Sequence, residues 1–121
     1  MAQFLIVDDA SVVRKVARRI VEDFGFDVVE AEHGEAALAV CREQMPDAIL
    51  VDWSMPVMDG FDFAKALRQE PGGNRPKVVI CTTEHDLAQI ARAMRAGADD
   101  YLMKPFDRES MEAKLQEVGL I

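Results

Sequence analysis

Short apolar runs alternate with longer amphipathic segments along the whole chain. Five runs have the length and composition of buried strands: 4–7, 27–31, 48–52, 77–81 and 100–103. Helical patterns follow them over 11–24, 34–44, 59–69, 86–96 and 107–119. Regular alternation of strands and helices predicts a parallel sheet with helices packed on both faces, a doubly wound α/β fold.

Local signals set the ends of several predicted helices. Ser11, or the acids before it, can cap the first helix, and Gly25 ends it. Asp86 with Gln89 forms a capping-box pattern, and Asp107 caps the last helix. One face of the first helix carries the apolar residues Val12, Val13, Val16, Ala17, Ile20, Val21 and Phe24.

Length and composition indicate one globular domain spanning residues 1–121. The chain has 121 residues, half of them hydrophobic and 30% charged, which is enough for one core and too little for two. The net charge of −8 argues against binding to a phosphate backbone, so we expect no nucleic-acid partner.

Neither a membrane span nor a signal peptide is apparent, which predicts a cytoplasmic protein without membrane contact. Cys41 and Cys81 lie far apart in the sequence and form no C-x-x-C pair. We expect both thiols to be free, buried and inert, and we find no ligand set for zinc.

Chemically active side chains stand where the predicted strands end. The first strand is followed by Asp8 and Asp9, the third ends on Asp52, the fourth is followed by Thr82, and Lys104 follows the fifth. The carboxyl ends of parallel strands face the crevice in which such sheets bind ligands. We therefore expect these five side chains to meet at one edge, where crowded carboxylates would share a proton or hold a cation.

An all-oxygen set of this kind suits Mg²⁺ better than Ca²⁺. A carboxylate beside Mg²⁺, a lysine and a hydroxyl supplies the parts for phosphoryl transfer to Asp52, because the cations neutralise charge on the phosphoryl oxygens. The residues themselves thus predict a Mg²⁺-dependent aspartyl-phosphate site.

The ordered set resembles the receiver domain of two-component response regulators over essentially the whole chain. It comprises Asp8-Asp9, the motif D-x-x-M-P-x-M-D-G beginning at Asp52, Thr82, Tyr101 and Lys104-Pro105. The resemblance implies a flavodoxin-like (βα)5 domain with strand order 2-1-3-4-5. It also implies a monomeric, stand-alone signalling protein of the chemotaxis or phosphorelay type, with no output domain and no metabolic enzyme activity.

The resemblance further implies roles around the phosphoacceptor. Asp52 would accept phosphate from a phosphohistidine on a sensor kinase or a phosphotransfer protein. Asp9, Asp52 and the backbone carbonyl of Ser54 would bind Mg²⁺ directly, and Asp8 would bind it through water. Lys104 would pair with the phosphoryl group.

The same resemblance implies a switch. Thr82 would move to the phosphate and Tyr101 would turn inward, remodelling the surface of the fourth helix, fifth strand and fifth helix that a downstream protein reads. The peptide bond between Lys104 and Pro105 would be cis. Ser54, Thr83 and Glu84 occupy positions that tune rates, and Thr83 is bulkier than the residue that the family usually has there.

A basic face on the first helix is either a solvated surface or the docking site for the phosphodonor. It consists of Arg14, Lys15, Arg18 and Arg19.

Three alternative functions compete with that of a phosphorylated receiver. The first, an interaction module that works without phosphorylation, stays open only because of the unusual Thr83. A flavodoxin-like FMN carrier conflicts with the acids after the first strand. A dehalogenase-type phosphatase conflicts with adjacent aspartates where a D-x-D motif is needed.

Overall fold

The computed structural model describes residues 2–83 and 87–121. Within them, five parallel strands form one sheet in the order β2-β1-β3-β4-β5, which confirms the predicted fold. The strands are β1 (Gln3–Val7), β2 (Asp27–Ala31), β3 (Ala48–Asp52), β4 (Lys77–Thr82) and β5 (Asp100–Met103). The helices are α1 (Ser11–Asp23), α2 (Gly34–Glu43), α3 (Gly60–Gln69), α4 (Leu87–Ala96) and α5 (Arg108–Glu117).

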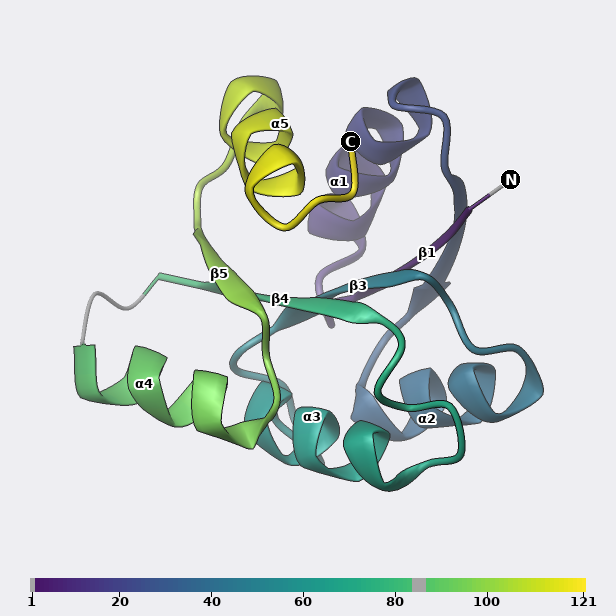
Figure 1. The fold of residues 1–121 in the computed structure, drawn as a ribbon. Helices are drawn as coiled ribbons and strands as arrows, with labels where there is room; N and C mark the ends of the chain where they lie inside the picture. Colours follow the sequence, from purple (N-terminus) through teal and green to yellow (C-terminus); the bar gives the residue numbers. More distant parts are fainter. Residues whose placement is uncertain (1, 84–86) are drawn as a thin grey trace.

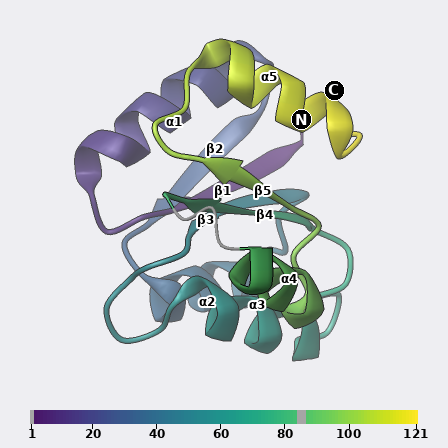
Figure 2. The ribbon, with the colours of Figure 1, turned by 90° about the vertical axis from the view of Figure 1, so that its left-hand side faces the viewer.

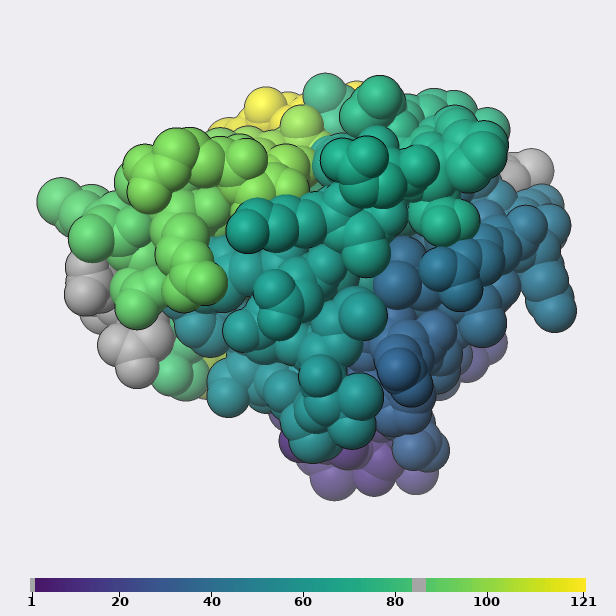
Figure 3. Space-filling view, turned by 90° about the horizontal axis from the view of Figure 1, so that it is seen from below, coloured from purple at the N-terminus to yellow at the C-terminus, as the bar shows by residue number. Residues whose placement is uncertain are grey.

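Helices cover both faces of the sheet. In Figure 1, α1 and α5 lie above the strands and α2, α3 and α4 lie below them. The perpendicular view in Figure 2 shows the same three layers. Seen from below, the surface is formed largely by the blue, teal and green segments that contain these three lower helices (Figure 3). No helix within the described residues is long and apolar enough to cross a membrane.

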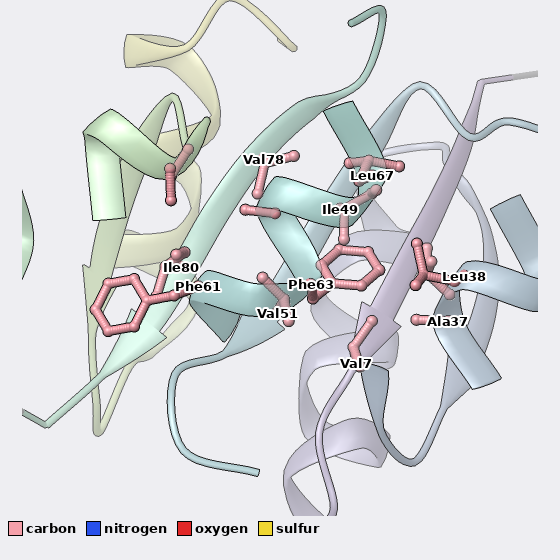
Figure 4. Close-up of a cluster of buried hydrophobic side chains, with 14 of the residues drawn as sticks. Val7, Ala37, Leu38, Ile49, Val51, Phe61, Phe63, Leu67, Val78 and Ile80 are labelled. Carbon is pink, nitrogen blue, oxygen red and sulfur yellow. The ribbon is translucent and has the colours of Figure 1, made fainter. Parts of the chain in front are cut away.

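The strands place alternate side chains in two separate cores, as the period of two in a strand requires. In β3, Ile49 and Val51 face α2, α3 and α4, whereas Ala48 and Leu50 face α1 and α5. Figure 4 shows the first of these cores, where strand residues meet the helices. It labels Val7, Ala37, Leu38, Ile49, Val51, Phe61, Phe63, Leu67, Val78 and Ile80.

Several predicted helix ends are confirmed, and others differ. Asp59 and Asp107 cap α3 and α5, and Gly25 follows α1 with a positive φ of 92°. At the start of α1 the prediction was wrong. The N-cap is Ala10, whose methyl side chain cannot accept a hydrogen bond, and the Asp8 carboxylate accepts the Ala10 N–H. The predicted capping box of the fourth helix includes Asp86, which lies outside the described residues.

The apolar faces of two helices are less buried than the pattern predicts. In α1, Val12 is 70% exposed and Val16 is 48% exposed, while Ala17 and Val21 are buried. In α4, the small residues Ala93 and Ala96 are buried, and Leu87 is 80% exposed. The sheet covers only part of each helical face, so amphipathic spacing alone overestimates burial.

Candidate functional site

Asp52 ends a strand in which every residue is buried, and its own side chain is only 10% exposed. Hydrogen bonds hold the next residue on both sides: the Trp53 N–H donates to the Cys81 carbonyl at 2.9 Å, and the Gly60 N–H donates to the Trp53 carbonyl at 3.0 Å. A Cβ on Gly60 would lie 2.9 Å from the backbone oxygen of Asp52. The close return of α3 to the end of β3 therefore requires glycine at this position.

Asp8 and Asp9 stand at the neighbouring end of β1. The Asp8 N–H donates to the Ala31 carbonyl of β2 at 3.1 Å, and the carboxylate accepts the Ala10 N–H at 2.9 Å. Asp8 is 3% exposed, whereas Asp9 is exposed. One carboxylate oxygen from each of Asp8, Asp9 and Asp52 lies within 4.8 Å of the others. The three acids thus form one cluster, which we call the acid cluster.

Lys104 follows β5 and reaches across the sheet edge to this cluster. Its Nζ donates to Asp8 Oδ2 at 2.9 Å and to Asp52 Oδ1 at 3.1 Å. The peptide bond between Lys104 and Pro105 is cis. Burial lowers the pKa of Lys104, but the bonds to Asp8 and Asp52 outweigh it, so the pKa is raised and the ammonium stays charged.

Burial is the main cause that raises the pKa of Asp52 above its ordinary value. The hydrogen bond from Lys104 lowers this pKa, whereas the negative charges of Asp8 and Asp9 raise it, and the net shift is upward. Three carboxylates against one ammonium leave an excess of negative charge when all are ionised. Clustered oxygens with excess negative charge fit a hard divalent cation such as Mg²⁺. Asp8, Asp9 and Asp52 are the side chains that can hold it.

A surface hollow opens beside Asp52. Its walls are formed by Asp52, Trp53, Ser54, Thr82, Thr83 and Lys104. Thr82 is 2% exposed at the end of β4, while Ser54 and Thr83 are exposed. Glu84, the third predicted rate-tuning residue, lies outside the described residues. The hollow therefore brings a carboxylate, a hydroxyl and an ammonium to one place, and it is open to a ligand of phosphoryl size.

An aromatic stack behind the hollow was not predicted. The rings of Trp53 and Phe61 pack edge to face with centroids 4.2 Å apart, and the Arg92 guanidinium of α4 lies 4.3 Å from the Phe61 centroid. The stack joins a wall of the hollow to the exposed side of α4. Nothing in the linear sequence pairs these residues, since they come from the β3–α3 connection, α3 and α4.

Tyr101 is a half-buried residue of β5, and the Lys114 ammonium of α5 lies 5.2 Å from its ring centroid. The ring lines a shallow groove between β5 and α5. Tyr101 is thus positioned on the predicted output surface, with its neighbours on α5.

The basic face of α1 is divided by the structure. Arg14 and Arg18 turn to Glu30 of β2, at 3.0 and 2.7 Å, whereas Lys15 and Arg19 are exposed.

Cys41 and Cys81 are free and buried as predicted, and burial raises the pKa of their thiols to about 11 and about 12. His33 caps α2 by accepting the Ala36 N–H at its Nδ1.

Fold and site together define a class of domain: a doubly wound α/β sheet whose edge carries a carboxylate cluster paired with one lysine. Residues 4–116 match the response regulator receiver domain. The chain therefore belongs to the response regulator receiver family, as its motifs predicted.

Individual relatives support a CheY-like receiver. The chain is 33% identical over 118 residues to a chemotaxis protein CheY homolog of Campylobacter jejuni, covering 96% of this chain and 91% of the relative. The structure of chemotaxis protein CheY4 of Vibrio cholerae superposes with a TM-score of 0.93 at 35% identity, covering 98% of both chains.

A second similar structure contains an ion. It is the receiver domain of the sensor histidine kinase PA1611 of Pseudomonas aeruginosa, with a magnesium ion coordinated in its active-site cleft. Its TM-score is 0.87 at 29% identity, and 98% of both chains is covered. These similarities identify a signalling protein of the receiver class, and they set aside the flavodoxin-like and dehalogenase-like alternatives.

Proposed function

We propose that this protein is a CheY-like response regulator that accepts a phosphoryl group on Asp52 from a phosphohistidine. One observation carries the proposal: Lys104 Nζ contacts both Asp8 and Asp52 within the acid cluster. This arrangement keeps one fixed positive charge where a transferred phosphoryl group would bring negative oxygens.

In the proposed reaction, Asp52 Oδ attacks the phosphorus atom of the phosphohistidine. The new P–O bond forms as the P–N bond breaks, and the imidazole nitrogen of the donor leaves with the electron pair and takes a proton. Mg²⁺ bound by Asp8, Asp9, Asp52 and the Ser54 carbonyl would supply positive charge to the phosphoryl oxygens. Lys104 would exchange its bond to Asp52 for one to the phosphoryl group.

The switch follows from the same hollow. Thr82 Oγ would donate to a phosphoryl oxygen, which would draw the end of β4 toward Asp52 and let Tyr101 turn inward. The surface of α4, β5 and α5 would then change for a downstream protein. Ser54 and Thr83, which also line the hollow, would control access of water to the acyl phosphate.

The phosphodonor would dock on α1 beside the hollow. An almost wholly apolar groove runs between α1 and the segment after β5, lined by Val12, Val13, Val16, Lys104, Pro105 and Phe106. Lys15 and Arg19 flank it as exposed cations. We propose a histidine-bearing helix with an apolar face and acidic flanks as the partner, and we expect the transfer to Asp52 to occur in the cytoplasm.

Intact-protein mass spectrometry after incubation with acetyl phosphate and Mg²⁺ tests the proposal. The wild type is expected to gain one phosphoryl group, and Asp52→Asn and an EDTA-treated sample are expected to gain none. Asp59→Asn is the matched control, because asparagine still caps α3 and the site is outside the acid cluster. An adduct that persists in Asp52→Asn would overturn Asp52 as the acceptor.

If the wild type gains no adduct, it could still be an interaction module that works without phosphorylation, or a receiver that does not accept small phosphodonors. Transfer from a phosphorylated histidine protein separates that alternative from a restriction on small donors. Wild type labelled by the protein but not by acetyl phosphate supports the proposal, whereas no labelling from either donor overturns it.

A further inference from the structure

Arg14 is much less exposed than an ordinary cation on a helix surface. Its side chain is 13% exposed, compared with 40% for Arg18 one turn later. Nη1 donates to the backbone carbonyl of Asp8 at 2.7 Å, and Nε donates to Glu30 Oε1 at 3.0 Å. The guanidinium therefore bridges the end of β1, where the acid cluster begins, and strand β2.

The carbonyl that Arg14 holds belongs to the peptide group between Asp8 and Asp9. A peptide group is planar, so fixing its oxygen also fixes the direction of the bond to the Asp9 Cα. The preceding peptide is held independently, because the Asp8 N–H donates to the Ala31 carbonyl at 3.1 Å. Arg14 thus orients the backbone that carries Asp9, the exposed member of the acid cluster.

The charge of Arg14 is compensated. Glu30 accepts hydrogen bonds from both Arg18 and Arg14. These bonds, chiefly the one from Arg18, hold the pKa of Glu30 below its ordinary value. Glu30 is therefore ionised at neutral pH. Its negative charge offsets the guanidinium and anchors it facing the Asp8 carbonyl, while Lys104 contacts the carboxylates.

We propose that Arg14 is a positioning residue for the cation site, acting on Asp9 through the Asp8–Asp9 peptide. The inference rests on the proposed function, since it requires that the acid cluster binds Mg²⁺. Partners outside the ligand set commonly orient ligands in this way, and their removal weakens metal binding by about 10- to 100-fold. Arg18 shares the anchor Glu30 but donates to the Val28 carbonyl instead, so it provides the matched control.

The test is the dissociation constant for Mg²⁺, measured by isothermal titration on the whole chain, together with the thermal midpoint of each variant. Arg14→Ala is expected to raise the dissociation constant about tenfold. Arg18→Ala is expected to leave it near the wild-type value, although both variants lower the midpoint. Arg14→Lys keeps the charge and the aliphatic stem but cannot span two acceptors as guanidinium does, so it is expected to bind Mg²⁺ weakly as well.

Each outcome has a separate meaning. Equal affinities of wild type and Arg14→Ala, or full affinity in Arg14→Lys, overturn the positioning role while leaving the proposed function intact. An Arg18→Ala variant weakened as much as Arg14→Ala attributes the effect to general destabilisation and also overturns it. A wild type that binds no Mg²⁺ overturns the proposed function itself. If Arg14→Ala does not fold, the Mg²⁺ affinity of Arg14→Lys decides whether the positioning role stands.

Discussion

Lys104 Nζ lies 3.1 Å from Asp52 Oδ1, although the two residues are 52 positions apart in the chain. The contact exists because β3 and β5 flank β4 in a parallel sheet and both end at the same edge. It joins the proposed phosphoacceptor to the cation that would later hold the phosphoryl group.

Replacing Lys104 should separate phosphoryl transfer from metal binding. In Lys104→Ala, loss of the ammonium is expected to slow phosphorylation by acetyl phosphate about a hundredfold, the usual cost of losing one group that stabilises developing charge. Mg²⁺ affinity is expected to hold or increase, because the acid cluster loses its cation. Rates followed by mass spectrometry and affinities by titration check this. The exposed Lys65→Ala is the control, and an unchanged rate in Lys104→Ala would contradict the assignment.

Asp52→Asn should stabilise the fold in the absence of divalent cations. The pKa of Asp52 is raised in the folded state, chiefly by burial, so ionising this carboxyl costs stability at every pH above that raised value. The gain from asparagine is therefore expected at pH 7, and it should disappear as the pH falls below the unfolded-state pKa. Thermal midpoints in EDTA at both pH values measure it, and a gain of 1 kcal/mol would appear as about 4 °C. A lower midpoint than wild type at pH 7 would show that the bond to Lys104 outweighs burial.

Gly60→Ala should damage the site where Gly34→Ala does not. Both glycines begin a helix, but a Cβ at Gly60 would lie 2.9 Å from the Asp52 backbone oxygen, whereas one at Gly34 would meet the flexible side chain of Met58 at 2.8 Å. We expect Gly60→Ala to lose about 2 kcal/mol of unfolding free energy and to be phosphorylated more slowly. Urea unfolding of both variants measures the difference. Equal losses of unfolding free energy in the two variants would contradict the prediction, because the backbone around Gly60 would then accommodate a Cβ as easily as the surroundings of Gly34.

Arg92→Ala should be detectable at Trp53. Removing the guanidinium from the Phe61 ring is expected to cost about 0.5–1 kcal/mol of unfolding free energy and to alter the emission of Trp53, the only tryptophan in the chain. Arg95→Ala, which changes an exposed arginine of the same helix, serves as the comparison. Identical spectra of the two variants would show that α4 is not coupled to the wall of the hollow.

The pattern of apolar and polar residues predicted most of the fold, because the helices and strands of this fold are set largely by features that are local in the sequence. Buried strands are continuous apolar runs, Gly25 permits a positive φ, and Asp59 and Asp107 cap the helices after them. The pattern misjudged Val12 and Val16, because how far a sheet extends beneath a helix is not encoded in helical spacing.

Sequence alone determined the family, the alternation of strands and helices, and the residue types at the strand ends. These follow from short-range chemistry and from motifs that can be read in order. Only the tertiary structure decided that Lys104 bridges two acids, that Arg14 fastens the Asp8–Asp9 peptide, and that Trp53, Phe61 and Arg92 form one stack. Side-chain geometry across the assembled sheet and helices sets those relationships, even where the residues are as close in the chain as Arg14 and Asp8.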